Sequence, residues 1–253
     1  MTSIITSISE YKARHGFGSF TPKAVLFDMD GVIYDSMPHH AIAWTESMAE
    51  AGIRMSVSEA YEYEGMRGVE TIGRLFEKQK GIKLDEKHAQ KYYDRKSEIF
   101  ASLGPARKME GVEELMHLIH SDGLVIGVVT GSGQKSLLNR LEKDFPGLLH
   151  KELMVTSSDV KIGKPAPDPY LQGLKKCGVE PWEAIVVENA PLGVKAAVAA
   201  RIFTVAVNTG PLPNSKLTEQ GSSLIFNRMT DFRDHWHELM AAARQQPTTI
   251  EEK

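Results

Sequence analysis

Cysteine is nearly absent from this sequence, as are long apolar runs and clusters of basic residues. Cys177 is the only cysteine among 253 residues, so no intramolecular disulfide can form, and we expect a reducing, cytoplasmic location. No apolar run approaches the ~18 residues that a membrane-spanning helix needs, and the first 22 residues lack the apolar stretch of a secretory signal. Lysine and arginine are dispersed and the net charge is −3, which leaves no basic surface for nucleic acid. We therefore expect neither a membrane nor a nucleic acid as a partner.

Short apolar runs alternate with helical patterns over much of the chain. The runs are continuous, which is typical of strands buried on both faces of a parallel sheet. The predicted strands are residues 24–27, 124–129, 153–155, 185–187, 204–207 and 224–226. Helical periodicity is found at residues 112–121, 134–143, 169–177 and 191–200. This alternation predicts an α/β fold with a doubly wound, Rossmann-like parallel sheet.

Residues 37–103 break this alternation, because they show helical periodicity and no strand-like run. Helices are predicted there at residues 38–51, 57–63, 69–80 and 85–101. At ~150 residues per domain, the length also suits a core with one smaller module. We therefore predict a leader at residues 1–22, a core at residues 23–35 and 105–245, and an all-helical cap inserted at residues 36–104. The cap would stand over the carboxyl end of the first strand, where open α/β sheets bind ligands.

Two polar motifs follow the first two predicted strands. Asp28 and Asp30 leave the first strand and enter a glycine turn, and two like charges this close are costly unless a cation or a function offsets them. Thr130, Gly131 and Ser132 follow the second strand, where hydroxyls and free amides can bind an anion. Taken alone, the first motif also suits a strand-ending turn, and the second suits an ordinary helix N-cap.

Two further motifs follow later strands. Lys164 precedes a proline-rich turn that opens a helix, so it can be held in one direction, although a single lysine is otherwise a typical surface residue. Glu188 and Asn189 leave a buried strand, and their oxygens suit Mg²⁺, although Asn189 would equally cap a helix. Together the four motifs supply a carboxylate nucleophile, a proton donor, a cation, anion-binding amides and metal ligands, as phosphoryl transfer requires.

With these four motifs in this order, the sequence resembles the haloacid dehalogenase (HAD) superfamily, in the branch similar to β-phosphoglucomutase. Within that branch it is most similar to the bacterial inorganic pyrophosphatases. The resemblance covers residues 23 to about 226. It implies Mg²⁺ as the cofactor, a small phosphorylated substrate and an aspartyl-phosphate intermediate, and we expect a monomer.

By this resemblance, Asp28 is the nucleophile, Asp30 is the general acid and then the base that activates water, and Lys164 neutralises the transferring group. The phosphoryl group would be bound by Thr130, Gly131 and Ser132. The metal would be held by the Asp28 carboxylate, the Asp30 carbonyl, Glu188 and Asn189. We expect metal contact to keep Asp28 ionised while Asp30 keeps a proton to donate.

One position departs from the pattern of the branch, because Asn189 stands where a second carboxylate is usual. The lost charge weakens the metal site unless another anion supplies it. Glu64 in the predicted cap is a candidate, and we hypothesise that it reaches Mg²⁺ when the cap closes. Closure would then leave room only for a small leaving group, such as that of pyrophosphate. A solvent-facing acid at a helix end is the alternative for Glu64.

A β-phosphoglucomutase or a sugar-phosphate phosphatase of the same branch is the alternative function. The mutases hold a second phosphate with cations at positions that here carry Glu64, Gly68 and Gly133, although Arg67 would compensate in part. His40 matches a cap-hinge histidine of the mutases that helps to gate the general acid, and a simply packed histidine is the alternative. A non-catalytic phosphate-binding module is a more remote hypothesis.

Overall fold

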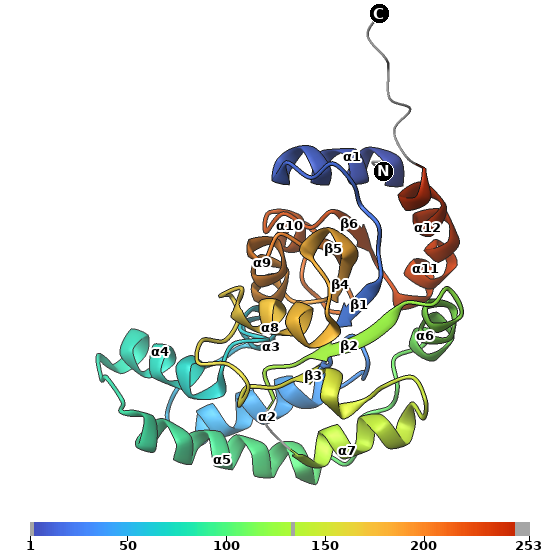
Figure 1. Cartoon of the computed structure of the whole chain (residues 1–253). Helices are drawn as coiled ribbons and strands as arrows, with labels where there is room; N and C mark the ends of the chain where they lie inside the picture. The colour runs from blue at the N-terminus through green and yellow to red at the C-terminus, as the bar shows by residue number, and fades with distance from the viewer. Residues whose placement is uncertain (1–2, 133–134, 246–253) are drawn as a thin grey trace, which may run out of the picture.

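The computed structural model describes residues 3–132 and 135–245, and a parallel sheet lies at its centre (Figure 1). Within these residues, six strands pair in the order β3-β2-β1-β4-β5-β6, and every neighbouring pair is parallel. They are β1 (Ala24–Phe27), β2 (Val125–Val129), β3 (Met154–Val155), β4 (Ala184–Glu188), β5 (Phe203–Val207) and β6 (Leu224–Phe226). The predicted doubly wound α/β fold is therefore confirmed.

Helices cover both faces of the sheet, because successive side chains of each strand point to opposite sides. Val25 and Phe27 of β1 join the apolar layer of one face, whereas Leu26 joins the layer of the other. The first face is covered by α1 (Ile4–His15), α6 (Val112–Ser121), α7 (Lys135–Asp144), α11 (Met229–Asp234) and α12 (Trp236–Arg244). The second carries α8 (Asp168–Cys177) and α9 (Pro191–Ala199), with α10 (Ser215–Thr218) beside α9. Two short 3-10 helices, η1 (Lys151–Leu153) and η2 (Pro181–Glu183), precede β3 and β4.

Helix α1, which lies within the predicted leader, packs against the core. Ile4, Ile8 and Tyr11 recur at helical spacing and are buried, and α1 lies beside α12. The Tyr11 hydroxyl lies within hydrogen-bond distance of the carbonyls of Pro181, at 3.1 Å, and Arg201, at 3.0 Å. Of the predicted leader, residues 1–2 lie outside the described part of the chain. The packing of α1 is hard to predict from the sequence, because the segment is polar overall and only one face of the helix is apolar.

Residues 37–102 fold into four helices along one edge of the sheet (Figure 1), and we call this segment the cap; its role as a separate cap domain stays a prediction. Its helices are α2 (Met37–Glu50), α3 (Val57–Glu62), α4 (Gly68–Lys80) and α5 (Glu86–Ser102). Ser56 and Glu59 form a reciprocal capping box at the start of α3, and Asp85 caps α5. The cap has an apolar core of its own, which includes Trp44 and Met48. Among the described residues, no helix is long and apolar enough to cross a lipid bilayer.

Candidate active site

The central strands end at one edge of the sheet and bring the first and fourth motifs together. Phe27 of β1 pairs with Val187 of β4, so Asp28 and Glu188, the next residues of the two segments, lie side by side. The Asp28 amide also donates to the Val187 carbonyl at 3.0 Å. The strand order reverses direction between β1 and β4, and open α/β sheets bind ligands at such a switch point.

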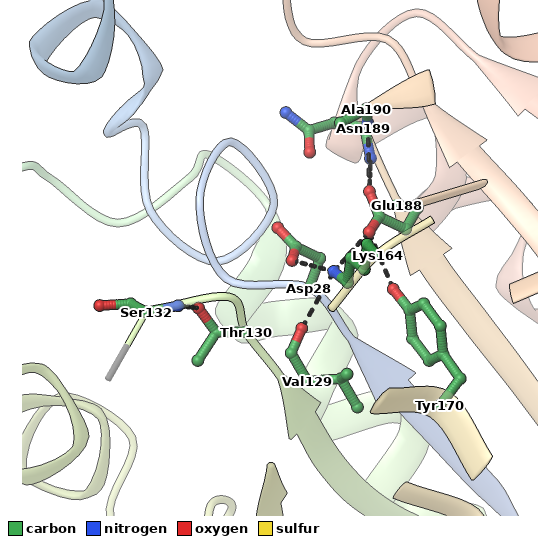
Figure 2. A network of polar contacts seen from close by, with 9 residues as sticks. All are labelled: Asp28, Val129, Thr130, Ser132, Lys164, Tyr170, Glu188, Asn189 and Ala190. Carbon is green, nitrogen blue, oxygen red and sulfur yellow. Dashed lines mark hydrogen bonds and ion pairs between the residues drawn. The ribbon is translucent and has the colours of Figure 1, made fainter. Parts of the chain in front are cut away.

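Lys164 lies at the centre of a buried polar network at this edge (Figure 2). Its Nζ is 2.5 Å from Asp28 Oδ1 and 2.6 Å from Glu188 Oε1, and it donates to the Val129 carbonyl at 3.2 Å. Burial alone would lower the pKa of Lys164, but the two carboxylates raise it above its usual value, so this side chain stays charged. The lysine of the third motif is thus in contact with carboxylates of the first and the fourth.

Both carboxylate oxygens of Glu188 have partners within the protein. Oε1 accepts from Lys164 and, at 2.8 Å, from the Tyr170 hydroxyl, whereas Oε2 accepts from the next two backbone amides at 2.9 and 3.1 Å. Gly193 leaves the room for this side chain, because a Cβ there would lie 1.7 Å from Glu188 Oε1. Glu188 therefore holds Lys164 in place. Its predicted role as a metal ligand stays a prediction, and this arrangement leaves it no unengaged oxygen.

Two buried oxygens at the same edge, Asp28 Oδ2 and Asn189 Oδ1, have no hydrogen-bond partner among the described residues. Such atoms are costly to bury unless an ion or a water satisfies them, and Mg²⁺ prefers oxygen ligands of this kind. Gly31 turns the chain here with a φ of 81°, and a Cβ on it would lie 2.0 Å from the Asn189 side-chain nitrogen. In the described ranges, no cluster of three or more His, Cys, Asp or Glu side chains is arranged to hold a metal. A set that includes an amide and a backbone carbonyl fits Mg²⁺ without such a cluster.

The two aspartates of the first motif have pKa values shifted in opposite directions. Burial raises the pKa of Asp28 well above its usual value; Lys164 opposes this rise and the neighbouring carboxylates add to it. Burial would also raise the pKa of Asp30, but the charge of His40 and a hydrogen bond from Ser36 bring it below its usual value. The predicted protonation states of the two aspartates depend on metal contact at Asp28, and they stay a prediction. Mg²⁺ beside Asp28 would restore its ionised form.

Asp30 is connected to the cap through a chain of polar side chains. Ser36 donates to Asp30 Oδ1 at 2.6 Å, and His40 Nε2 lies 3.1 Å from the same oxygen, although that contact is not aligned as a hydrogen bond. Lys96 Nζ of α5 lies 2.7 Å from His40 Nδ1, on the ring whose Nε2 approaches Asp30. His40, predicted as a cap-hinge residue, is therefore placed directly beside Asp30.

Lys96 is buried among aromatic rings of the cap. Its Nζ lies 5.2 Å from the centre of the Trp44 ring and 5.0 Å from that of Phe100, so the rings stabilise its charge. Burial nevertheless lowers the pKa of Lys96 to about 8, against the opposing charges of Glu64 and Asp30. The cap thus presents a buried cation whose charge is sensitive to its surroundings.

A small cavity of about 40 Å³ lies between Asp30 and the cap. Glu64, which is half-buried, lines this cavity together with His40 and Lys96. Burial raises the pKa of Glu64, while the charge of His40 opposes that rise. The structure therefore brings the predicted cap residues Glu64 and His40 to the same small space as Asp30.

A sequence model described as haloacid dehalogenase-like hydrolase matches residues 25–207, which is most of the chain. The chain belongs to this family. It is 30% identical over 190 residues to validoxylamine A 7'-phosphate phosphatase of Streptomyces hygroscopicus subsp. limoneus, which covers 74% of this chain and 86% of that protein. It is also 30% identical over 198 residues to hexitol phosphatase A of Escherichia coli (strain K12), which covers 78% and 88%.

The relatives include phosphomutases as well as phosphatases. A solved structure titled putative beta-phosphoglucomutase from Bacteroides vulgatus is 47% identical, with a TM-score of 0.92, and covers 96% of this chain and 98% of that one. Beta-phosphoglucomutase of Bacillus subtilis (strain 168) is 26% identical over 196 residues, which are 74% of this chain and 84% of that protein. These matches confirm the predicted superfamily and its β-phosphoglucomutase-like branch. The closer resemblance to inorganic pyrophosphatases stays a prediction.

The second HAD motif lies at the end of β2, against the cap. The amide of Thr130 donates to the Val155 carbonyl at 2.9 Å, and its hydroxyl accepts from the Ser132 amide at 3.0 Å. Gly131 faces the cap, because a Cβ on it would lie 3.2 Å from the carbonyl oxygen of Gly65. The motif is thus at the same edge of the sheet as Asp28, and its role in phosphate binding stays a prediction.

Arg67 does not line the cavity at Asp30. Its guanidinium lies 3.1 Å from Glu86 and 3.7 Å from Glu70, and its stem packs on the core at Gly163, where a Cβ would lie 2.9 Å from Arg67 Cγ. Gly133, weighed above as a lost cation site of the mutases, lies outside the described residues. Arg67 therefore belongs to the contact between the cap and the core in this structure.

Three polar side chains of this HAD site were not singled out from the sequence. Ser36 and Lys96 adjust the surroundings of Asp30, and Tyr170 holds the Glu188 carboxylate. Tyr170 carries no signal in the sequence, because a buried aromatic residue on a core helix is ordinary packing. Lys96 could have been found from the sequence, because it lies within the apolar stripe of α5 and lysine is rarely buried without a partner.

Proposed function

We propose that this chain is a Mg²⁺-dependent phosphohydrolase of small sugar or polyol phosphates that works through an aspartyl-phosphate on Asp28. The observation that carries the proposal is the buried contact of Lys164 with Asp28 and Glu188, beside the unpartnered oxygens of Asp28 and Asn189. A nucleophile, a cation that neutralises phosphoryl charge and ligands for a hard cation meet there in one place.

The proposed reaction has two steps. In the first, an Asp28 oxygen attacks phosphorus, the bond from phosphorus to the leaving-group oxygen breaks, and Asp30 gives its proton to that oxygen. In the second, Asp30 takes a proton from a water whose oxygen attacks phosphorus, and the bond between Asp28 and phosphorus breaks. Phosphate leaves, Asp28 is again a free carboxylate and Asp30 is again protonated.

Asp30 must be protonated when the substrate reacts, yet its pKa in the free protein is lower than usual. An anionic phosphate ester beside Asp30 favours the neutral form of this carboxyl, because like charges repel. Substrate binding therefore raises the pKa of Asp30 and prepares it as the acid. His40 and Lys96, which approach from the cap, oppose this rise and keep the base form accessible for the second step.

The metal site is proposed on the Asp28 carboxylate, the Asp30 carbonyl and Asn189. Mg²⁺, when bound, neutralises charge on the phosphoryl group as it transfers. Since Asn189 brings no charge, Glu64 is proposed to supply a second carboxylate when the cap is closed. Glu64 lines the same cavity as Asp30, which supports this role.

The substrate class rests on the relatives. Two of the relatives are named hexitol phosphatase A and validoxylamine A 7'-phosphate phosphatase, and a third is named phosphorylated carbohydrates phosphatase. Pyrophosphate is a second candidate, because the cavity beside Asp30 measures only about 40 Å³ and holds the acid Glu64. A phosphomutase remains the alternative chemistry of the branch, and it would need a cation for a second phosphate.

The test is phosphate release from a panel of substrates in Mg²⁺ and in EDTA. Sorbitol 6-phosphate, glycerol 3-phosphate and pyrophosphate are compared, and β-glucose 1-phosphate is assayed for both phosphate and glucose 6-phosphate. We expect Mg²⁺-dependent release of phosphate from a sugar or polyol phosphate. Preference for pyrophosphate by more than about tenfold in kcat/KM would favour the second candidate, and glucose 6-phosphate as the product would favour the mutase. No turnover with any metal would support a binding module and defeat the proposal.

A further inference from the structure

Two spaces adjoin under the cap, and three residues border both of them. The inner cavity, with Asp30, has a volume of about 40 Å³, and an outer cleft against α4 and α5 has about 410 Å³. Both are lined by Gly68, Tyr93 and Gly131. Tyr93 has the only large side chain of these three. Its ring therefore stands between the small space at the reacting group and a much larger one outside.

The Tyr93 ring packs against Gly68 and has Trp44 and Lys96 as further neighbours. It rests on Gly68 so closely that a Cβ at position 68 would lie 2.1 Å from ring carbons Cδ2 and Cε2. The ring centre of Trp44 is 6.3 Å from that of Tyr93, and Lys96 Nζ is 5.9 Å from the Tyr93 centroid. Any side chain larger than glycine at position 68 would displace the ring. Gly68 and Tyr93 thus form one steric unit.

We propose that Tyr93, seated on Gly68, is the wall that limits the size of the leaving group. This inference rests on the proposed phosphohydrolase function and names its substrate range: short polyol phosphates, of about three carbons, ahead of hexitol or hexose phosphates. With the wall in place, the inner cavity has room for only a few water-sized groups beyond the phosphoryl site. A longer leaving group has to displace the ring to reach the outer cleft.

The lining of the outer cleft indicates what it would accept once the wall is removed. Its polar residues are Arg67, Gln90, Asp94, Ser97 and Ser157. Arg67 is already paired with Glu86, and Gln90 donates to Asp94 at 2.7 Å. Hydroxyl, amide and carboxylate groups suit the hydroxyls of a neutral polyol, whereas Asp94 opposes a second phosphate. The cleft therefore fits the uncharged end of a hexitol phosphate.

The experiment compares kcat/KM for sorbitol 6-phosphate with that for glycerol 3-phosphate, in the full-length protein with Mg²⁺. In Tyr93→Ala, we expect the ratio of sorbitol 6-phosphate to glycerol 3-phosphate to rise by about tenfold over the unmutated protein. Tyr93→Phe keeps the ring and should leave the ratio unchanged. Tyr92→Ala is the matched control, because Tyr92 is the neighbouring tyrosine on α5 and stacks on Phe76 within the cap, with ring centres 4.8 Å apart. It should also leave the ratio unchanged.

The outcomes separate this inference from the proposed function. If the unmutated protein hydrolyses neither ester, the phosphohydrolase proposal fails. If it hydrolyses them and Tyr93→Ala leaves the ratio unchanged, the wall is rejected while the function stands. An equal rise of this ratio in Tyr92→Ala would show that a loosened cap causes the change, and it would also reject the wall. Should Tyr93→Ala fail to give the thermal unfolding transition of a folded protein, Tyr93→Leu is measured by the same criterion.

Discussion

At the scale of single residues, the site depends on charges that the motif positions alone do not reveal. Lys164 is in contact with two carboxylates, and Asn189 contributes a neutral oxygen where the branch usually has a charged one. The buried, unpartnered oxygens of Asp28 and Asn189 mark the place at which a cation would complete the balance of charge.

Restoring that charge should strengthen the metal site. In Asn189→Asp, the added carboxylate increases the attraction for Mg²⁺, so we expect half-maximal activity at an Mg²⁺ concentration lower by about tenfold. The measurement is phosphate release during an Mg²⁺ titration. Asn214→Asp is the control, because Asn214 hydrogen-bonds to Asn208 and Asn227 away from the site, and the same change of charge there should have no effect. Half-maximal activity of Asn189→Asp at an unchanged or higher Mg²⁺ concentration would contradict the assignment.

The burial of Lys96 should make the stability of the protein depend on pH. The pKa of Lys96 falls from an ordinary 10.5 to about 8 in the folded protein, so the unfolded chain binds more protons between these values, and folding becomes more favourable as pH rises through them. Below pH 8, Lys96 is charged in both the folded and the unfolded protein, so burying this charge destabilises the folded state by its full amount. We therefore expect the Tm of Lys96→Met, relative to that of the unmutated protein, to be highest near neutral pH and to decline from about pH 8 to 10.5.

The control for this prediction is Lys91→Met, an exposed lysine on the same helix. The Tm difference between Lys91→Met and the unmutated protein should not decline over the same pH range. A difference for Lys96→Met that does not vary over this pH range would show that the lysine titrates normally. Lys96→Met should also lower turnover, because His40 loses the polar contact that orients its ring toward Asp30.

At the scale of elements, helix α1 stabilises the core without taking part in the site. Tyr11→Phe removes a hydroxyl that lies near the carbonyls of Pro181 and Arg201. We expect the free energy of unfolding to fall by about 1 kcal/mol, since a part-buried carbonyl loses its donor, and kcat/KM to stay the same. Urea unfolding with the activity assay measures both. Unaltered stability, or a loss of activity at equal stability, would contradict this separation.

The sequence predicts the elements better than their contacts. Continuous apolar runs indicate the parallel strands, and polar residues after them indicate the edge where Asp28, Lys164 and Glu188 meet. The packing of α1 was not predicted, because one apolar face in a polar segment is a weak signal. The pKa directions of Asp28 and Asp30 could not be predicted from the motif, because they depend on burial and on His40, which approaches Asp30 from the cap.

At the scale of the whole molecule, the cap and core meet through glycines. Gly65 of the cap has a φ of 85°, and a Cβ on it would lie 3.0 Å from Lys164 Cδ. Gly65→Ala adds backbone strain and a methyl group at this contact, so it should disfavour the closed arrangement. We expect kcat/KM to fall by about tenfold or more with little change in Tm, because a 1 Å misplacement of reacting groups is costly.

Gly81→Ala is the control for this prediction. Gly81 also has a positive φ, of 66°, but nothing lies within 4 Å of its Cβ position, so the strain is reproduced without the contact. Equal losses of kcat/KM in the two variants would indicate that strain within the cap, rather than its contact with the core, is responsible.

The most direct measurement is mass spectrometry of the protein quenched in acid during turnover of a phosphate ester with Mg²⁺. We predict that one phosphoryl group is attached to the peptide that contains Asp28, and that it is absent from Asp28→Asn, which should also release no phosphate. Turnover with no phosphorylated protein in the quenched samples, or a phosphoryl group on another residue, would contradict the role of Asp28 as the nucleophile.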